Sequence, residues 1–115
     1  MAVRVLIVDD DVVFRDAIAA SLTTLGYEVV GHAGTLAEAR SAIPGCRPDA
    51  LLLDVNLPDG SGLGFLEEPF GDGVRVLLTS SDPDAASQRS VRRSGAVGFV
   101  AKTALLMTDL RPYLG

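Results

Sequence analysis

Acidic, hydroxyl and cationic side chains follow apolar, strand-like runs at four points of the sequence. In chain order these side chains belong to Asp9 and Asp10, Asp54, Thr79 and Lys102. Carboxylates gathered in one place repel, by about 4 kcal/mol for two unit charges ~4 Å apart at an effective dielectric of 20, so a cation must offset them. Oxygen ligands without His or Cys nearby select Mg²⁺ or Mn²⁺, and a site with few protein ligands suits Mg²⁺. With a lysine and a hydroxyl added, the set suits phosphoryl chemistry in which Asp54 is the nucleophile.

Asp54 is the residue around which this chemistry is organised. It ends the apolar run Leu51-Leu52-Leu53 and precedes a turn that contains Pro58. A short unbroken apolar run is typical of a strand buried on both faces of a parallel sheet, and ligands bind beyond the carboxyl ends of such strands. Taken alone, the stretch also allows a plainer interpretation, in which the aspartate simply starts the turn.

The elements that must position these residues follow from periodicity and from helix start and stop signals. We expect strands over residues 3–8, 28–33, 51–54, 74–78 and 98–101. We expect helices over residues 12–25, 35–43, 63–68, 83–94 and 104–113, the third cut short by Pro69 and the fourth polar and weakly held.

Several residues mark where these helices begin and end. Asp10 or Asp11 caps the first helix and Gly26 ends it. Thr35 and Glu38 form a capping box, and the pair at residues 44–45 ends that second helix. Asp82 caps and Pro83 opens the fourth helix, and residues 60–62 form a mobile loop.

Five strand–helix units in succession predict one α/β domain over residues 1–115. Short connections give right-handed parallel crossovers, so we expect a three-layer, doubly wound (βα)5 sandwich of the flavodoxin-like kind with strand order 2-1-3-4-5. In that order the first, third, fourth and fifth strands are neighbours. Asp9, Asp10, Asp54, Thr79 and Lys102 therefore meet at one edge of the sheet.

Composition restricts the class of protein. A length of 115 residues suits a single domain with its own core. The net charge of −5 argues against direct contact with nucleic acid. We expect no membrane segment and no signal peptide, because no apolar run approaches the ~18 residues of a span. The single cysteine, Cys46, favours a reducing compartment, so we expect a cytoplasmic protein.

From end to end the chain resembles the receiver domain of two-component response regulators. The matching motifs are Val8-Asp9-Asp10-Asp11, Leu53-Asp54-Val55-Asn56-Leu57-Pro58-Asp59-Gly60-Ser61-Gly62, Leu77-Leu78-Thr79-Ser80-Ser81, and Ser94-Gly95-Ala96 followed by Gly98-Phe99-Val100-Ala101-Lys102. The resemblance implies that Asp54 accepts a phosphoryl group from a sensor histidine kinase or a phosphotransfer protein.

The resemblance also implies roles for the residues around Asp54. Asp9 or Asp10 and Asp54 bind Mg²⁺ together with the backbone carbonyl of Asn56, and Asp10 matches the more constant ligand. Thr79 and Lys102 each contact a phosphoryl oxygen. Phe99 is the aromatic residue that changes rotamer when Thr79 moves.

The output is the remaining part of what the resemblance implies. The protein is a signalling switch that assists its own phosphorylation and dephosphorylation, and is not a turnover enzyme. Through the face formed by the fourth helix, fifth strand and last helix, it controls an output domain or a partner protein, or pairs with a second copy as a homodimer. Many receivers have proline after the lysine, whereas Thr103 here matches receivers that precede helix-turn-helix output domains, which suggests regulation of transcription.

The sequence leaves alternatives to a phosphoacceptor switch. An interaction module of the same fold that works without phosphorylation is the main alternative, although such versions usually lack an acid, the threonine or the lysine. An aspartate-nucleophile phosphatase needs a general acid where Asn56 stands. A calcium-binding loop starting at Asp54 fails because Pro58 and Phe65 occupy ligand positions. We expect His32 to be structural or solvent-facing, and the three arginines at 89, 92 and 93 to form a solvated face or a patch for an acidic partner.

Overall fold

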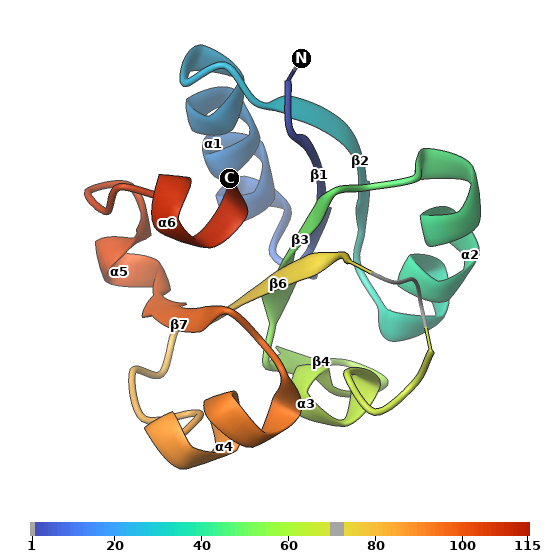
Figure 1. Cartoon of the computed structure of the whole chain (residues 1–115), viewed down its shortest axis with the longest axis vertical. Helices are drawn as coiled ribbons and strands as arrows, with labels where there is room; N and C mark the ends of the chain where they lie inside the picture. Colours follow the sequence, from blue (N-terminus) through green and yellow to red (C-terminus); the bar gives the residue numbers. More distant parts are fainter. Residues whose placement is uncertain (1, 70–72) are drawn as a thin grey trace.

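The computed structural model describes residues 2–69 and 73–115 and has a parallel sheet at its centre (Figure 1). The sheet contains β1 (Arg4–Val8), β2 (Glu28–Ala33), β3 (Ala50–Asp54), β6 (Arg75–Ser80) and β7 (Gly98–Ala101), in the order β2-β1-β3-β6-β7. Numbered among themselves, the five strands have the order 2-1-3-4-5. The predicted doubly wound topology is confirmed.

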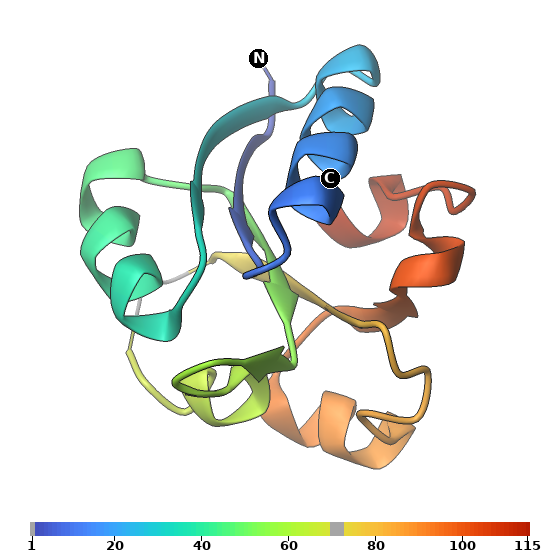
Figure 2. The ribbon, with the colours of Figure 1, turned by 180° about the vertical axis from the view of Figure 1, so that it is seen from behind.

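Both faces of the sheet are covered by helices, which explains why the central strands are apolar throughout. On one face α2 (Leu36–Cys46), α3 (Gly62–Phe65) and α4 (Gln88–Ser94) pack against Leu6, Leu51, Leu53 and Leu78. On the other face α1 (Val12–Thr24), α5 (Lys102–Leu105) and α6 (Arg111–Leu114) pack against Val5, Ile7, Leu52 and Leu77. The view from behind in Figure 2 shows the same division into three layers.

The first two helices begin where the sequence indicated. Asp11 is the N-cap of α1, and Gly26 follows its end with a φ of 96°. Thr35 is the N-cap of α2 and accepts a hydrogen bond from the backbone N–H of Glu38. The prediction that residues 44–45 end α2 was wrong, because Pro44 lies in the last turn and the Arg47 N–H still reaches the Ile43 carbonyl at 2.9 Å.

The segment after Asp54 is more ordered than we expected. Residues 60–62 were predicted to be a loop, but β4 (Asn56–Leu57) and β5 (Gly60–Ser61) form an antiparallel hairpin. The brief third helix is confirmed as the four-residue α3. β6 continues past the expected end at residue 78, because Thr79 pairs with Asp54 and Ser80 pairs with Ala101.

The fourth helix is shorter than predicted. The helix predicted from Pro83 starts only at Gln88, because Asp82 forms a separate turn by accepting from the Asp84 N–H at 2.9 Å. Ser87 then caps α4 by accepting from the Ser90 N–H.

The last helix is also interrupted, and residues 104–113 do not form one helix. In one continuous helix over these residues, Pro112 could not donate to the carbonyl four residues earlier and its ring would crowd that carbonyl. Pro112 instead lies in the first turn of a separate helix, α6, where its missing N–H is tolerated. Across the residues that the structure describes, none of the helices has the length and apolar character needed to cross a membrane.

Candidate functional site

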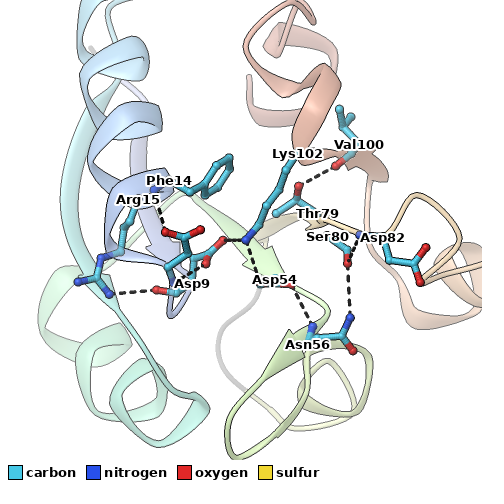
Figure 3. Close-up of polar contacts among 11 residues, drawn as sticks. Asp9, Phe14, Arg15, Asp54, Asn56, Thr79, Ser80, Asp82, Val100 and Lys102 are labelled. Carbon is cyan, nitrogen blue, oxygen red and sulfur yellow. Dashed lines mark hydrogen bonds and ion pairs between the residues drawn. The ribbon is translucent and has the colours of Figure 1, made fainter.

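The carboxyl ends of four neighbouring strands bring the predicted polar residues together (Figure 3). Asp9 follows β1, Asp54 ends β3, Thr79 lies opposite Asp54 in β6, and Lys102 follows β7. These residues converge because parallel strands place their carboxyl ends on the same edge of the sheet.

Three carboxylates form an acidic cluster at this edge. One oxygen from each of Asp9, Asp10 and Asp54 lies within 4.8 Å of the others. Asp9 and Asp54 are buried, with exposed fractions of 1% and 5%, whereas Asp10 is exposed. The cluster therefore has two buried charges and one that faces solvent.

Lys102 offsets the two buried charges directly. Its Nζ lies 2.8 Å from Oδ2 of Asp9 and 3.2 Å from Oδ2 of Asp54. The ring of Phe14 lies on another side of the ammonium, with its centroid 4.6 Å from Nζ. Burial alone lowers the pKa of Lys102, but its hydrogen bond to Asp9 and the charges of both carboxylates outweigh this effect and raise the pKa. Lys102 is therefore a cation held in place between two acids.

The surroundings of Asp54 shift the pKa of its carboxyl upward. Burial raises the pKa of the Asp54 carboxyl above its ordinary value, and the charge of Asp9 adds to this effect. The Asn56 N–H, which donates to Oδ1 at 3.0 Å, and the Lys102 ammonium oppose the increase only in part. An additional cation at the cluster would favour the ionised carboxylate.

Backbone hydrogen bonds orient the acids. The Asp11 N–H donates to Oδ1 of Asp9 at 2.9 Å, and Nη1 of Arg15 donates to the Asp9 carbonyl at 3.0 Å. Phe14 and Arg15 were not singled out from the sequence as site residues. Both lie in the first turn of α1, and their contacts depend on segments that meet them only after folding.

The Thr79 hydroxyl, which we expected to contact a phosphoryl oxygen, hydrogen-bonds to a backbone carbonyl in this structure. It is buried and donates to the Val100 carbonyl at 2.7 Å, which ties β6 to β7. Phe99, the other predicted switch residue, is partly buried and packs against the apolar cluster on the face covered by α2, α3 and α4, outside the acidic cluster. The structure thus brings Asp9, Asp10, Asp54 and Lys102 together, with Thr79 opposite Asp54 in the neighbouring strand, and leaves Phe99 in the apolar core outside the acidic cluster.

Ser80 links the segments that follow β3 and β6, and the sequence did not single it out. Its Oγ accepts from Nδ2 of Asn56 at 3.4 Å and from the Asp82 N–H at 3.1 Å. The predicted metal-binding residue Asn56 is exposed and lies in the hairpin directly after Asp54.

The donor set fits a hard divalent cation. Three carboxylates supply oxygen ligands within reach of one another. Oxygen donors in small number, one of them on an exposed side chain, suit Mg²⁺ with several retained waters. The arrangement can bind such an ion and stabilise an anionic group near the Asp54 carboxylate.

The chain is similar to a family of signalling domains and to several known proteins. A family model described as the response regulator receiver domain matches residues 5–111. The DNA-binding transcriptional activator DevR/DosR of Mycobacterium tuberculosis is 38% identical over 104 residues, which are 87% of this chain and 48% of that protein. A protein-glutamate methylesterase/protein-glutamine glutaminase of Agrobacterium fabrum is 47% identical over 114 residues, covering 96% of this chain and 32% of that protein.

A solved structure has the same fold. The signal receiver domain of NarL from Mycobacterium tuberculosis matches with a TM-score of 0.76 and 30% identity, over 92% of this chain and 88% of that one. The chain spans less than half the length of the curated relatives that it matches.

Proposed function

The chain belongs to the response regulator receiver domain family, and on this premise we propose that it is a phosphoacceptor switch in which Asp54 accepts a phosphoryl group in a Mg²⁺-dependent reaction. The observation that carries the proposal is the buried arrangement of Lys102 between Asp9 and Asp54, beside the exposed Asp10. A structural ion pair needs one acid for one lysine, whereas here Lys102 contacts two buried acids and a third carboxylate, that of Asp10, lies within 4.8 Å of both.

The proposed reaction is a phosphoryl transfer to a carboxylate. An oxygen of Asp54 forms a bond to phosphorus while the bond from phosphorus to the donor breaks, and the electron pair of that bond leaves with the donor, a histidine nitrogen in the case of a kinase. Asp9, Asp10, Asp54 and the Asn56 carbonyl would hold Mg²⁺, which would supply positive charge to offset the carboxylates and the phosphoryl oxygens. Lys102 is already within reach of Asp54 and stabilises the charge on the product.

We propose that the output depends on Thr79 and on the face formed by α4, β7 and the C-terminal segment that contains α5 and α6. The phosphoryl group adds roughly −1.5 to −2 charge and three acceptors, which compete with the Val100 carbonyl for the Thr79 hydroxyl. When the Thr79 side chain moves toward the phosphoryl group, it leaves a space, and the ring of Phe99 in β7 turns inward to fill it. α4 is the element most easily displaced, because it is seven residues long and its buried residue is Val91.

The partners follow from the same proposal. A sensor histidine kinase or phosphotransfer protein supplies the phosphoryl group in the cytoplasm, and an output domain, a partner protein or a second copy of the chain reads the switched face. Since one relative is named as a DNA-binding transcriptional activator, regulation of transcription is the output we propose. The chemistry proposed for this domain is phosphorylation and dephosphorylation of its own Asp54, with no turnover of a separate substrate.

Intact-mass measurement tests the proposal. The protein is incubated with Mg²⁺ and acetyl phosphate, and in parallel with EDTA in place of Mg²⁺ or as the Asp54→Asn variant. We expect one added phosphoryl group that requires both Mg²⁺ and Asp54. A folded wild-type protein that gains no phosphoryl group would instead support the interaction module that works without phosphorylation.

A further inference from the structure

Asp59 makes a contact that the proposed chemistry does not use. It lies at the turn of the β4–β5 hairpin, and its two carboxylate oxygens accept from two backbone amides, Leu36 N–H at 2.8 Å and Ala37 N–H at 3.0 Å. Leu36 and Ala37 are the first residues of α2, whose first amides have no partner within the helix. The hairpin is therefore attached to the start of α2 by a carboxylate that binds with both oxygens.

α2 is a rigid anchor for this contact. Leu36, Ala39 and Ile43 are buried against the sheet, which fixes the position of the helix. Thr35 accepts from the Glu38 N–H at 3.1 Å, so the next amide along the helix already has a partner. Asp59 completes this cap from outside the helix, and two parallel hydrogen bonds restrict the carboxylate in direction as well as in distance.

The other end of the hairpin rests on the phosphoacceptor itself. The Gly62 N–H donates to the Val55 carbonyl at 2.8 Å, and a Cβ at Gly62 would clash with the Asp54 carbonyl oxygen. A Cβ at Gly60 would lie 3.0 Å from the Leu36 side chain, so the hairpin fills the space between Asp54 and α2 closely. Asn56 lies within this short segment, between the contact to Asp54 and the contact to α2.

We propose that Asp59 is a positioning residue, which sets the place of the Asn56 backbone carbonyl relative to Asp9, Asp10 and Asp54 by fixing the hairpin to α2. This inference rests on the proposed function, in which that carbonyl is a ligand of Mg²⁺. Residues that orient metal ligands change metal affinity although they do not touch the metal, commonly by ten- to hundredfold.

The chain offers two matched controls. Thr35→Ala removes another cap hydrogen bond from the same end of α2 and leaves the hairpin contact in place. Glu68→Gln weakens a second contact between α2 and the segment after α3. In that contact the Glu68 carboxylate accepts hydrogen bonds from Nε and Nη2 of Arg40, both at 2.6 Å. If Asp59 acts only by stabilising α2, these variants should behave as Asp59 variants do.

The test is a Mg²⁺ titration of the folded full chain, by calorimetry or by NMR, without any phosphodonor. We expect Asp59→Ala to bind Mg²⁺ on the order of tenfold more weakly than the wild type. Asp59→Asn keeps one acceptor oxygen and should lose less, and it serves if Asp59→Ala does not fold. Thr35→Ala and Glu68→Gln should bind Mg²⁺ as the wild type does. Amide exchange at Gly62 should speed up in the Asp59 variants alone, because that amide reports the hairpin directly.

The outcomes separate this inference from the proposed function. If the wild type binds Mg²⁺ and the Asp59 variants bind it equally well, Asp59 does not position the ligand. If Thr35→Ala weakens binding as much as Asp59→Ala, the effect belongs to the stability of α2, and the inference is again overturned. A wild-type protein that does not bind Mg²⁺ would overturn the proposed function itself, and this inference with it.

Discussion

Replacement of Lys102 by methionine should expose the electrostatic cost of the acidic cluster. Methionine matches the lysine side chain up to the ε carbon and removes the ammonium that lies 2.8 Å from Asp9 and 3.2 Å from Asp54. At 4.8 Å, the greatest separation within the cluster, two carboxylates repel by about 3.5 kcal/mol at an effective dielectric of 20. Removing one partner of a buried ion pair costs ~3–5 kcal/mol. We expect Lys102→Met to lower the free energy of unfolding by about 3 kcal/mol, at the low end of this range, because the cluster lies at an edge of the sheet that water reaches.

The assay is urea unfolding at pH 7 with EDTA present, followed by far-UV circular dichroism because the chain has no tryptophan. Asp54→Asn removes one of the two carboxylates that Lys102 separates, so Lys102→Met should cost much less in that background than in the wild type. Mg²⁺ should also restore the stability of Lys102→Met more than it stabilises the wild type, since it supplies the missing positive charge. A loss below ~0.5 kcal/mol, or an equal loss in both backgrounds, would refute the electrostatic reasoning.

Three further predictions concern contacts around the cluster. Phe14→Leu should lower the free energy of unfolding by roughly 1 kcal/mol through the lost contact with Lys102, and a double-mutant cycle with Lys102→Met should show coupling, whereas additive losses would contradict it. Thr79→Val should cost ~1–3 kcal/mol in urea unfolding because the Val100 carbonyl loses its donor, whereas Thr79→Ser should cost less; equal losses would exclude the hydrogen bond as the cause. Because the pKa of Asp54 is raised in the folded metal-free protein, Asp54 adds stability at low pH that is lost as the pH rises through this pKa. Unfolding from pH 4 to 7 should therefore show the wild type losing stability relative to Asp54→Asn, and a constant difference would contradict the shift.

The fold and the convergence of the site residues were predictable from the sequence, because both depend on strand order. Apolar runs followed by Asp9, Asp54 and Lys102 identify strand ends, and doubly wound topology places those ends together. The same reasoning located Thr79, although its hydrogen bond to Val100 depends on a side-chain rotamer that strand order does not determine.

The wrong predictions concern where helices begin and end, and there one local sequence signal competes with another. Asp82 and Ser87 are both good helix caps, and the sequence does not show that Ser87 starts α4. Pro112 was overlooked as a break in the last helix, although its missing N–H is visible in the sequence. The contacts of Phe14 and Asp59 were not predictable because their partners, Lys102 and the start of α2, are brought to them only by tertiary packing.

Mapping of the phosphoryl group tests the central claim most directly. The protein is treated with acetyl phosphate and Mg²⁺, reduced with borohydride, which converts an aspartyl phosphate to homoserine, and digested for peptide mass analysis. We predict homoserine at position 54 in the Mg²⁺-treated sample and unchanged aspartate there when EDTA replaces Mg²⁺. Homoserine at Asp9 or Asp10 instead, or unchanged aspartate at all three positions of a folded sample, would contradict the assignment of Asp54 as the phosphoacceptor.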